Sequence, residues 1–223
     1  MRFSTKWEQK MFKFIIASNN EGKIRELRTM LSGFGEVMSQ KQAHISLEPA
    51  ENGNSFKQNA LIKAKSIYNT LPQEKKNTFI VADDSGICVE ALDGKPGIFS
   101  ARYASPNSKK NANDEANRYK LISELKKQKL AESSAKFVAC VALVGEGAHG
   151  ERVEFCAMGE CEGKVIAQER GKNGFGYDSV FIPKGFDTTL AEVAPEVKNT
   201  LSHRRKALEQ IKEFLELFEP MIT

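Results

Sequence analysis

The sequence predicts an α/β protein with a mixed β-sheet whose central part is antiparallel. Strands and helices alternate early in the chain, which is typical of parallel strands joined by helices. Residues 136–168 contain several strands in succession, which favours antiparallel pairing. An amphipathic helix over residues 202–218 closes the chain.

Each element of the first half follows from the spacing of its apolar residues. Ile24, Leu27 and Leu31 recur at three- and four-residue intervals, which predicts a helix. A second helix is expected to end before Pro72. The expected elements are strands over residues 12–18, 78–82 and 87–92 and helices over residues 21–31 and 55–71.

The second half adds a hairpin and further helices. Asn113 is a helix cap, followed by acids in the first turn where the helix dipole favours them. The sequence Thr189-Leu-Ala-Glu192 predicts a capping box for a short helix. The expected elements are helices over residues 113–129 and 202–218 and strands over residues 136–144, 151–158, 163–168 and 179–182.

Composition excludes several classes of protein. Of 223 residues, 40% are hydrophobic, and the longest strongly apolar run, residues 138–144, is far below the roughly 20 residues that span a bilayer. The first 20 residues are charged and do not form a signal peptide. The four cysteines include no C-x-x-C pair and are expected to be buried free thiols. We therefore expect one cytoplasmic domain over residues 1–223, without a membrane partner.

The charge balance indicates a small anionic ligand. The formal net charge is +4, from 33 basic and 29 acidic residues. A protein that binds duplex nucleic acid is expected to carry a dense basic stripe. The basic runs of this chain are short and interrupted by acidic or apolar residues. No nucleic-acid partner is expected.

The first candidate site is Ser18-Asn19-Asn20-Glu21-Gly22-Lys23, between an apolar strand and a helix start. Free backbone N–H groups and the positive end of the helix dipole make such a position an anion site, and the lysine can reach a phosphate. It is not a Walker P-loop, because Ala17 replaces the first glycine and Ile24 the Ser/Thr. A plain polar turn is the alternative, and this segment alone does not decide between the two.

The second candidate combines Glu51 with Asn59 and Lys63. The last two are four residues apart and so share a helix face. Together the three residues offer a carboxylate, an amide and an ammonium group to one cleft. From spacing alone, however, a capped and solvated helix N-terminus is the favoured interpretation.

The third candidate is Asp83-Asp84-Ser85-Gly86 at the end of an apolar strand. Two adjacent carboxylates there are costly unless a cation meets them, and Mg²⁺ takes hard oxygen ligands from one or two carboxylates and from phosphates. The alternative is an Asx-type turn, which Ser-Gly supports. The metal site is favoured because residues 78–82 direct both acids to the carboxyl end of the sheet, where ligands of α/β proteins bind.

The fourth candidate lies in the glycine-rich segment 171–178, which contains Phe175, Gly176, Tyr177 and Asp178. Its glycines allow the backbone to approach a flat ligand while the phenylalanine ring stacks on it. A plain loop does not explain the large aromatic residue in its middle.

The fifth candidate is Lys198-Asn-Thr-Leu-Ser-His203-Arg204-Arg205 at a helix start. Basic residues are unfavourable beside the positive end of a helix dipole unless an anion or polar ligand binds there. His203 alone is more often structural, and the neighbouring basic residues make it a candidate ligand contact.

Taken in order, these segments resemble the inosine triphosphate pyrophosphatase family, the non-canonical purine nucleoside triphosphate pyrophosphatases. The resemblance rests on IIASNNEGK, ENGNSFKQNALIKA, VADDSGICVEALDGKPGIFSARYA, GFGYDSVFIP, TLAEV and KNTLSHRRKAL, which span residues 15–208. It implies a long mixed sheet with two lobes and a central cleft, a homodimer, and Mg²⁺-dependent hydrolysis of ITP, dITP and XTP to the monophosphate and pyrophosphate.

The resemblance also implies a role for particular residues. Glu51 and Asp84 match the metal-binding acids, and Asp84 also matches the proposed general base. Asp83 and Lys63 match the acid and the lysine beside them, Asp83 as a third metal residue and Lys63 as a catalytic one. The substrate-binding positions are Ser18, Asn19, Asn20, Glu21, Gly22, Lys23, Ser85, Phe175, Gly176, Tyr177, Asp178, Lys198, His203 and Arg204.

Three features depart from the family pattern. Ser179 stands where proline is usual and Arg205 where a small residue is usual, and both are expected to alter the loops near the base. Residues 1–10 precede the usual start and are expected to be a non-functional extension.

Two other functions remain as alternatives. One is a pyrophosphatase for another base, of the dTTP or UTP type, and the other is a non-catalytic nucleotide or nucleic-acid binder. Glu51, Asp83 and Asp84 argue against the binder, because bare carboxylates repel phosphates. For a purine, donors from the segment Ser202-His203-Arg204 would favour an acceptor O6 over the donor of adenine.

Overall fold

The computed structural model describes residues 12–72, 77–106, 111–147 and 149–218, and it is built around one six-stranded mixed sheet. The strand order is β2-β1-β3-β4-β5-β6, in which β1 pairs in parallel with β2 and β3, and the pairs from β3 to β6 are antiparallel. The strands are β1 (Phe12–Ile16), β2 (Gly35–Ser39), β3 (Thr78–Val89), β4 (Glu132–Glu146), β5 (Arg152–Ile166) and β6 (Phe181–Pro183).

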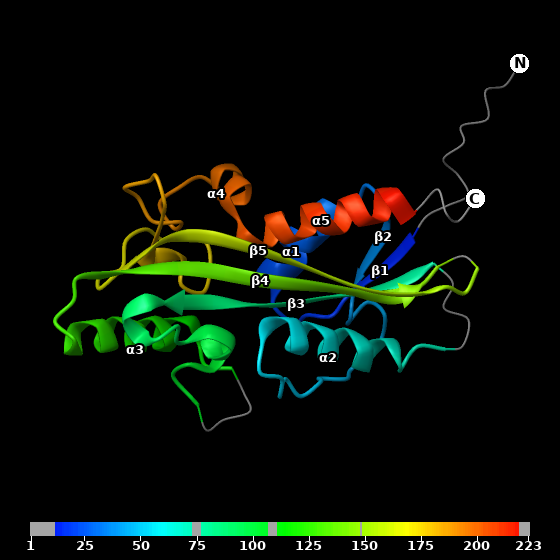
Figure 1. Cartoon of the computed structure of the whole chain (residues 1–223), viewed down its shortest axis with the longest axis horizontal. Helices are drawn as coiled ribbons and strands as arrows, with labels where there is room; N and C mark the ends of the chain where they lie inside the picture. The colour runs from blue at the N-terminus through cyan, green and yellow to red at the C-terminus, as the bar shows by residue number, and fades with distance from the viewer. Residues whose placement is uncertain (1–11, 73–76, 107–110, 148, 219–223) are drawn as a thin grey trace, which may run out of the picture.

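Helices cover both sides of this sheet. Figure 1 shows α4 and α5 along one side of the long strands and α2 and α3 along the other. The α-helices are α1 (Glu21–Leu31), α2 (Phe56–Tyr68), α3 (Asp114–Lys127), α4 (Pro195–Leu201) and α5 (His203–Phe218). Three 3₁₀ helices complete the described elements: η1 (Glu90–Leu92), η2 (Gly97–Arg102) and η3 (Asp178–Val180).

The core has two layers because side chains alternate along β3. Phe79 and Val81 pack in one cluster with Leu27 of α1 and Ile211 of α5. The intervening Ile80 and Ala82 pack in a second cluster with Ala60, Ala64 and Ile67 of α2. The side that a residue of β3 faces is therefore set by its place in the alternation. This alternation continues into the acids that follow.

The predicted fold class is confirmed, and so are most of the elements. The helix predicted over residues 21–31 has those bounds, and Asn20 caps it by accepting a hydrogen bond from the Lys23 N–H at 3.0 Å. Asn113 caps α3 as predicted, by accepting from the Ala116 N–H at 2.7 Å. The division into two lobes stays a prediction.

The largest correction concerns Asp83-Asp84-Ser85-Gly86, which neither forms a turn nor ends a strand. It lies inside the 12-residue strand β3. A Cβ on Gly86 would lie 2.3 Å from both the Gly97 carbonyl oxygen and the Ser100 Oγ, so this glycine allows η2 to approach the strand. Since Ile16, the last residue of β1, pairs with Val81, the acids still follow the end of the parallel strands.

Three further predictions of secondary structure are wrong. The strands predicted over residues 151–158 and 163–168 are one continuous strand, β5, because pairing with β4 continues through Gly159. Residues 189–192 form a turn instead of a helix, although the Thr189 N–H does donate to Glu192. The strand predicted over residues 87–92 ends at Val89, because residues 90–92 form η1. Neither β2 nor α4 was predicted.

The remaining predictions concern the N-terminal extension, the cysteines and membrane spans. The expected extension over residues 1–10 lies outside the described residues, and so does the side chain of Phe218. The four cysteines are free, with Cys140 and Cys161 buried and the other two half-buried. In the described part of the chain, every helix is too short or too polar to serve as a membrane span.

Candidate active site

A pocket of about 110 Å³ lies where the start of α1, the middle of β3 and the loops around α4 meet. It is the point at which most of the predicted nucleotide-binding segments come together. Its lining residues are Asn20, Lys23, Ser85, Gly86, Ser100, Ala101, Asp114, Asn117, Phe137, Cys161, Phe175, Gly176, Tyr177, Asp178, Leu190, Lys198, Ser202, His203 and Arg204.

Asp83 anchors the cations of this pocket. One carboxylate oxygen lies 2.5 Å from Lys23 Nζ and accepts from the Ser85 hydroxyl at 3.0 Å, and the other accepts from Arg204 Nε at 3.3 Å. Although burial opposes ionisation, the Arg204 and Lys23 charges hold the pKa of Asp83 well below its usual range. Both oxygens of this buried carboxylate are therefore occupied by cationic or hydroxyl partners.

Arg204 is held on three sides. Its Nη1 is paired with Glu26 of α1, its Nε with Asp83, and its Nη2 donates to the Ser85 hydroxyl at 3.1 Å. The side chain is only 4% exposed, so its charge is neutralised by these acids and not by water. Such a guanidinium is fixed in place before any ligand binds.

Asp84 faces the other side of β3, toward α2. Asn59 Nδ2 donates to its carboxylate at 3.1 Å, and the oxygen of the same amide accepts from the Gly53 N–H at 2.8 Å. Asn59 thus links Asp84 to the loop that carries Glu51. Lys63 Nζ lies 2.9 Å from the Glu51 carboxylate and donates to the Asp83 carbonyl at 3.1 Å.

Asp84 is poised to exchange a proton near neutral pH. Burial, with a smaller contribution from the Glu51 charge, raises the pKa of Asp84 to about 6. The Lys63 and Lys23 charges act in the opposite direction. The Lys23 charge thus lowers the pKa of both Asp83 and Asp84, and the same lysine lines the pocket. A carboxylate with a pKa near the working pH is suited to act as a general base.

The glycine-rich loop places an aromatic ring over the pocket. Phe175 lies 4.5 Å below Lys198 Nζ and packs so closely on Gly22 that a Cβ there would lie 2.7 Å from its ring. Asp178 holds the loop by accepting from the Phe175 N–H at 2.8 Å and from Lys198 at 2.6 Å. The Phe175 ring is therefore held in the pocket wall by contacts with Lys198 and Gly22 and by the Asp178 carboxylate.

His203 is an uncharged, buried part of the pocket wall. Its ring stacks on Phe137 with centroids 4.9 Å apart and planes at 9°. Burial, together with the neighbouring Arg204 charge, lowers the pKa of His203 well below its usual range. The imidazole is therefore neutral at pH 7, and it can donate one hydrogen bond and accept another.

A second and larger groove, of about 700 Å³, lies on the other half of the sheet, between the end of β3 and β6. Its three lysines, Lys136, Lys164 and Lys184, are each paired with a glutamate at 2.7–2.9 Å. The groove is lined by none of the sequence-predicted site residues, which gather instead around the smaller pocket, so the smaller pocket is the better candidate nucleotide site.

Comparison with known proteins shows the family to which this chain belongs. The family model described as the Ham1 family matches residues 14–214. The chain belongs to the Ham1 family. The dITP/XTP pyrophosphatase of Campylobacter jejuni is 45% identical to this Ham1 chain over 206 residues, which cover 92% of the chain and 98% of that protein.

Solved structures of the Ham1 family share the fold. The Staphylococcus aureus Ham1 protein superposes with a TM-score of 0.74 at 34% identity, over 92% of this chain and 98% of that one. The nucleoside-triphosphatase / dITP/XTP pyrophosphatase from Mycobacterium abscessus gives 0.66 at 36% identity, over 90% and 98%. The family resemblance drawn from the motifs is confirmed.

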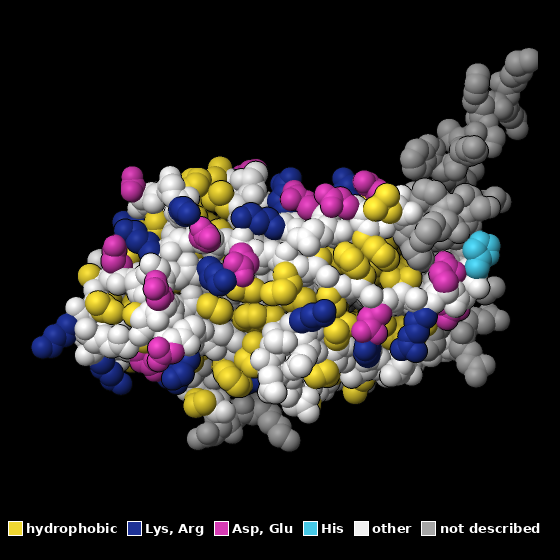
Figure 2. Space-filling model, viewed as in Figure 1, with side chains coloured by type: hydrophobic (Ala, Val, Ile, Leu, Met, Phe, Trp, Pro, Cys, Tyr) yellow, Lys and Arg dark blue, Asp and Glu magenta, His cyan; other side chains and the backbone are white. Residues whose placement is uncertain are grey.

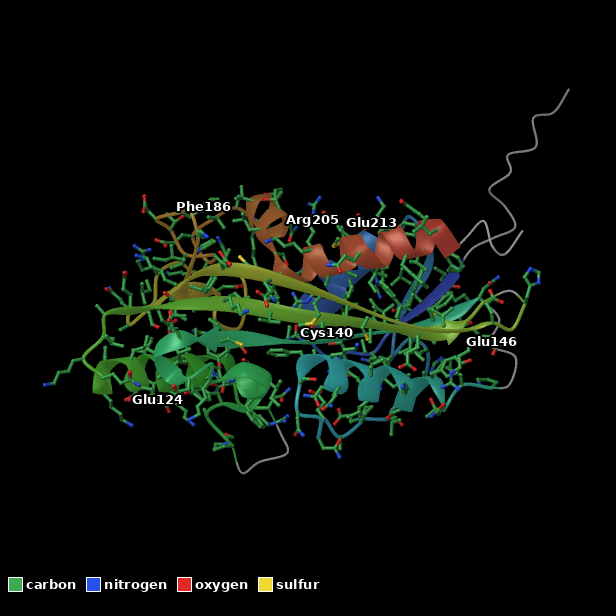
Figure 3. The ribbon with its side chains drawn as sticks, viewed as in Figure 1. Glu124, Cys140, Glu146, Phe186, Arg205 and Glu213 are labelled. Carbon is green, nitrogen blue, oxygen red and sulfur yellow. The ribbon has the colours of Figure 1, made fainter. Side chains whose placement is uncertain are left out.

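The structure of this Ham1 chain brings most predicted residues to one place, with some exceptions. Asn19 and Glu21 are exposed, and Asn19 donates to Glu48 instead of facing the pocket. The solvated helix N-terminus favoured from spacing at Asn59 is wrong, because that side chain is fully buried against Asp84. Figure 3 shows Arg205 on the outer side of α5, where it pairs with Glu209 at 2.8 Å. Its expected effect on the loops near the base stays a prediction.

Sequence reasoning missed two contributors to the site. Glu26 lies one turn after Lys23 on the same face of α1, a spacing that could have indicated it. Asp114 of α3 lines the pocket and accepts from the Gly176 N–H at 2.7 Å. No local pattern connects Asp114 to a loop 62 residues away.

Proposed function

We propose that this chain hydrolyses non-canonical purine nucleoside triphosphates, ITP, dITP and XTP, to the monophosphate and pyrophosphate, with Mg²⁺. The observation that carries the proposal is a pair of lysines that connect the acids to the pocket. Lys63 pairs with Glu51 at 2.9 Å and donates to the Asp83 carbonyl at 3.1 Å, and Lys23 pairs with Asp83 at 2.5 Å and lines the pocket. The names of the Campylobacter jejuni and Mycobacterium abscessus relatives, both dITP/XTP pyrophosphatases, support it. An enzyme that acts on nucleoside triphosphates is thus the function that the site supports best.

The donor set fits a magnesium ion that is shared with the substrate. Within the described ranges, no group of three or more His, Cys, Asp and Glu side chains gathers as a metal site. Glu51 and Asp84 therefore offer two carboxylates, which is the number that Mg²⁺ commonly takes when phosphates and waters complete its shell. Their mutual repulsion, seen in the raised pKa of Asp84, is relieved by a cation between them.

Asp83 is proposed as an anchor and not as a metal ligand. Its oxygens are taken by Lys23, Arg204 and Ser85, and its side chain is fully buried. It also lies on the opposite side of β3 from Asp84. Its role is to hold the two cations in the pocket.

The hydrolysis requires water to attack the α-phosphorus while the bond to the bridging oxygen of the β-phosphate breaks. Asp84, whose carboxylate faces α2 and accepts from the Asn59 amide at 3.1 Å, takes the proton of this water. Lys23 and Lys63 stabilise the negative charge of the departing pyrophosphate. Mg²⁺, when bound by Glu51 and Asp84, lowers the pKa of a bound water and neutralises phosphate charge.

Base selection is proposed to come from donors around the 6-position of the purine. Lys198, the neutral His203 ring and the remaining N–H groups of Arg204 line the pocket and are donors. Hypoxanthine and xanthine present an acceptor O6, whereas adenine presents a donor. Each unpaired buried group costs about 1–3 kcal/mol, so several such contacts are needed to reject ATP.

The test is pyrophosphate release from ITP, XTP, GTP, ATP and dTTP, with Mg²⁺ and with chelator. We expect release from ITP and XTP only with Mg²⁺. Preference for dTTP would replace the proposal with the pyrophosphatase for another base. Absence of turnover, with binding to polynucleotide that weakens steeply with salt, would replace it with the non-catalytic binder.

Metal binding is tested separately from turnover. Calorimetry of Mg²⁺ binding to the wild type and to Glu51→Gln should show at least a tenfold loss of affinity in the variant, because one of two carboxylate ligands is removed. The matched control is Glu154→Gln, whose carboxylate forms a surface pair with Lys65 at 2.8 Å. Equal affinity in all three proteins would remove Glu51 from the metal site.

The homodimer implied by the family resemblance is part of the same proposal. Hydrophobic side chains gather along the middle of the face shown in Figure 2, where β4 and β5 run, and Met158 of β5 is 45% exposed. Exposed apolar patches commonly mark subunit contacts. Light scattering on the purified chain, with a mass near twice 24.8 kDa expected, tests the dimer.

A further inference from the structure

Helix α3 binds both the N–H and the carbonyl of Gly176 in the glycine-rich segment 171–178, which we call the base-binding loop. The Gly176 N–H donates to Asp114 Oδ2 at 2.7 Å, and Arg118 Nη1 donates to the Gly176 carbonyl at 2.9 Å. Asp114 and Arg118 are one helical turn apart, so they reach the loop from the same face of α3. Gly176 has a φ of +61°, a left-handed conformation that glycine adopts without strain.

Arg118 is in turn held by a residue on the other side of the loop. Its Nε donates to Glu169 Oε2 at 3.0 Å, and the same oxygen accepts from the Ser179 hydroxyl at 3.0 Å. Ser179 is therefore connected to Gly176 through Glu169 and Arg118. These contacts bracket the loop segment that carries Phe175 and Tyr177.

We propose that Asp114, Arg118, Glu169 and Ser179 act as positioning residues for the base-binding loop. The inference rests on the proposed function, because it assigns these residues a part in holding the purine. By fixing Gly176, they set the places of the Phe175 ring and of Tyr177 in the pocket wall. None of the four is required as a metal ligand, a base or a donor to phosphate.

Ser179 is held through both its side chain and its backbone. Its hydroxyl donates to Glu169 Oε2 at 3.0 Å, and its carbonyl accepts from the Arg170 N–H at 2.8 Å. Two hydrogen bonds to consecutive residues therefore restrain the chain just after the segment that carries Phe175 and Tyr177.

The network is suited to control of binding more than of stability. Arg118 and Glu169 are 18% and 39% exposed, and ion pairs of this kind contribute little to the folded state. Their loss should leave the melting temperature within about 3 °C of the wild type. The Gly176 carbonyl, by contrast, loses its partner when Arg118 is replaced, which frees the segment that carries Phe175 and Tyr177.

The first test separates KM from kcat. Arg118→Ala should raise KM for ITP about tenfold, the value of one charged hydrogen bond, with kcat within about threefold of the wild type. Ser179→Ala should raise KM about threefold, whereas Ser179→Thr, which keeps a hydroxyl for Glu169, should keep the wild-type KM. Lys164→Ala and Glu132→Ala, which break a surface pair at 2.7 Å on another part of the sheet, are matched controls and should leave KM unchanged.

A double-mutant cycle tests whether Ser179 acts through Glu169. In a Glu169→Ala background, Ser179→Ala should add no further rise in KM, because the link to Arg118 is already broken. Additive effects in this cycle, unchanged KM in Arg118→Ala, or equal losses in the two control variants would overturn the proposal.

Hydrogen exchange makes the result independent of turnover. Amides of residues 174–178 should exchange at least tenfold faster in Arg118→Ala than in the wild type, whereas amides of α5 should not change. If the wild type releases no pyrophosphate, the proposed function is wrong, and the exchange rates still test whether Arg118 positions the loop. If pyrophosphate is released but exchange and KM are unchanged in Arg118→Ala, only the positioning role is wrong.

Discussion

Asp83 and Asp84 are consecutive residues of β3, and their carboxylates work on opposite sides of the sheet. Asp83 meets Lys23 of α1 at 2.5 Å and Arg204 of α5 at 3.3 Å, whereas Asp84 accepts from Asn59 of α2 at 3.1 Å. The alternation of side chains along a strand enforces this separation. One acid pairs with the cations of the pocket, and the other is the acid that we propose as the base.

Replacement of Asp84 should abolish turnover and spare substrate binding. Asp84→Asn keeps an oxygen for the Asn59 amide and removes the base, so kcat should fall by about 10³-fold or more. Pyrophosphate release measures the rate, and calorimetry with ITP measures the affinity. A kcat within a factor of ten of the wild type would take Asp84 out of the role of base.

The same variant should be more stable than the wild type at neutral pH. Burial raises the pKa of Asp84 to about 6, so the folded protein binds this proton more tightly than the unfolded chain and loses stability as pH rises from about 4 to 6. In chelator at pH 8, Asp84→Asn should therefore gain about 2–3 kcal/mol of unfolding free energy. The gain should vanish near pH 4, as urea unfolding at both pH values would show. A loss of stability in Asp84→Asn at pH 8 would contradict the conclusion that the buried Asp84 charge destabilises the fold.

Replacement of Asp83 should weaken the fold. Asp83→Asn leaves the buried Arg204 without its anionic partner in β3, which should cost about 3–5 kcal/mol in urea unfolding at pH 7. Because the pKa of Asp83 is lowered, its contribution is present above about pH 4 and is lost as pH falls further. Glu160→Gln, the partner of exposed Lys136 at 2.8 Å, should cost less than about 1 kcal/mol and is the control. Equal costs would mean that burial of the pair has no effect.

A methyl group at Gly22 should displace the base-stacking ring. The Cβ of Gly22→Ala would lie 2.7 Å from Phe175, so the ring must move and KM for ITP should rise about tenfold. Helix stability should not suffer, since alanine is the better helix former. Gly33→Ala, where a Cβ meets nothing within 4 Å, is the control and should keep the wild-type KM. Steady-state kinetics and thermal melting of both variants decide the point.

Local pattern was enough for much of the fold. Apolar spacing located α1 at its observed bounds, and the cap at Asn113 marked the start of α3. The ordered segments from residue 15 to residue 208 identified the family. These features are readable because helix period, capping and motif order depend on residues that are close in the chain.

Tertiary structure decided what became of the charged residues. Asp83-Asp84-Ser85-Gly86 has the composition of a turn, and it stays in a strand because Arg204, 121 residues away, neutralises the first acid and η2 packs on the glycine. Asn59 is buried by an acid 25 residues away, and Gly176 is held by an acid 62 residues away. The sequence alone determined which chemical groups are present and on which elements they lie. Tertiary structure determined which of these groups meet, because charge neutralisation between distant elements is not encoded in local spacing.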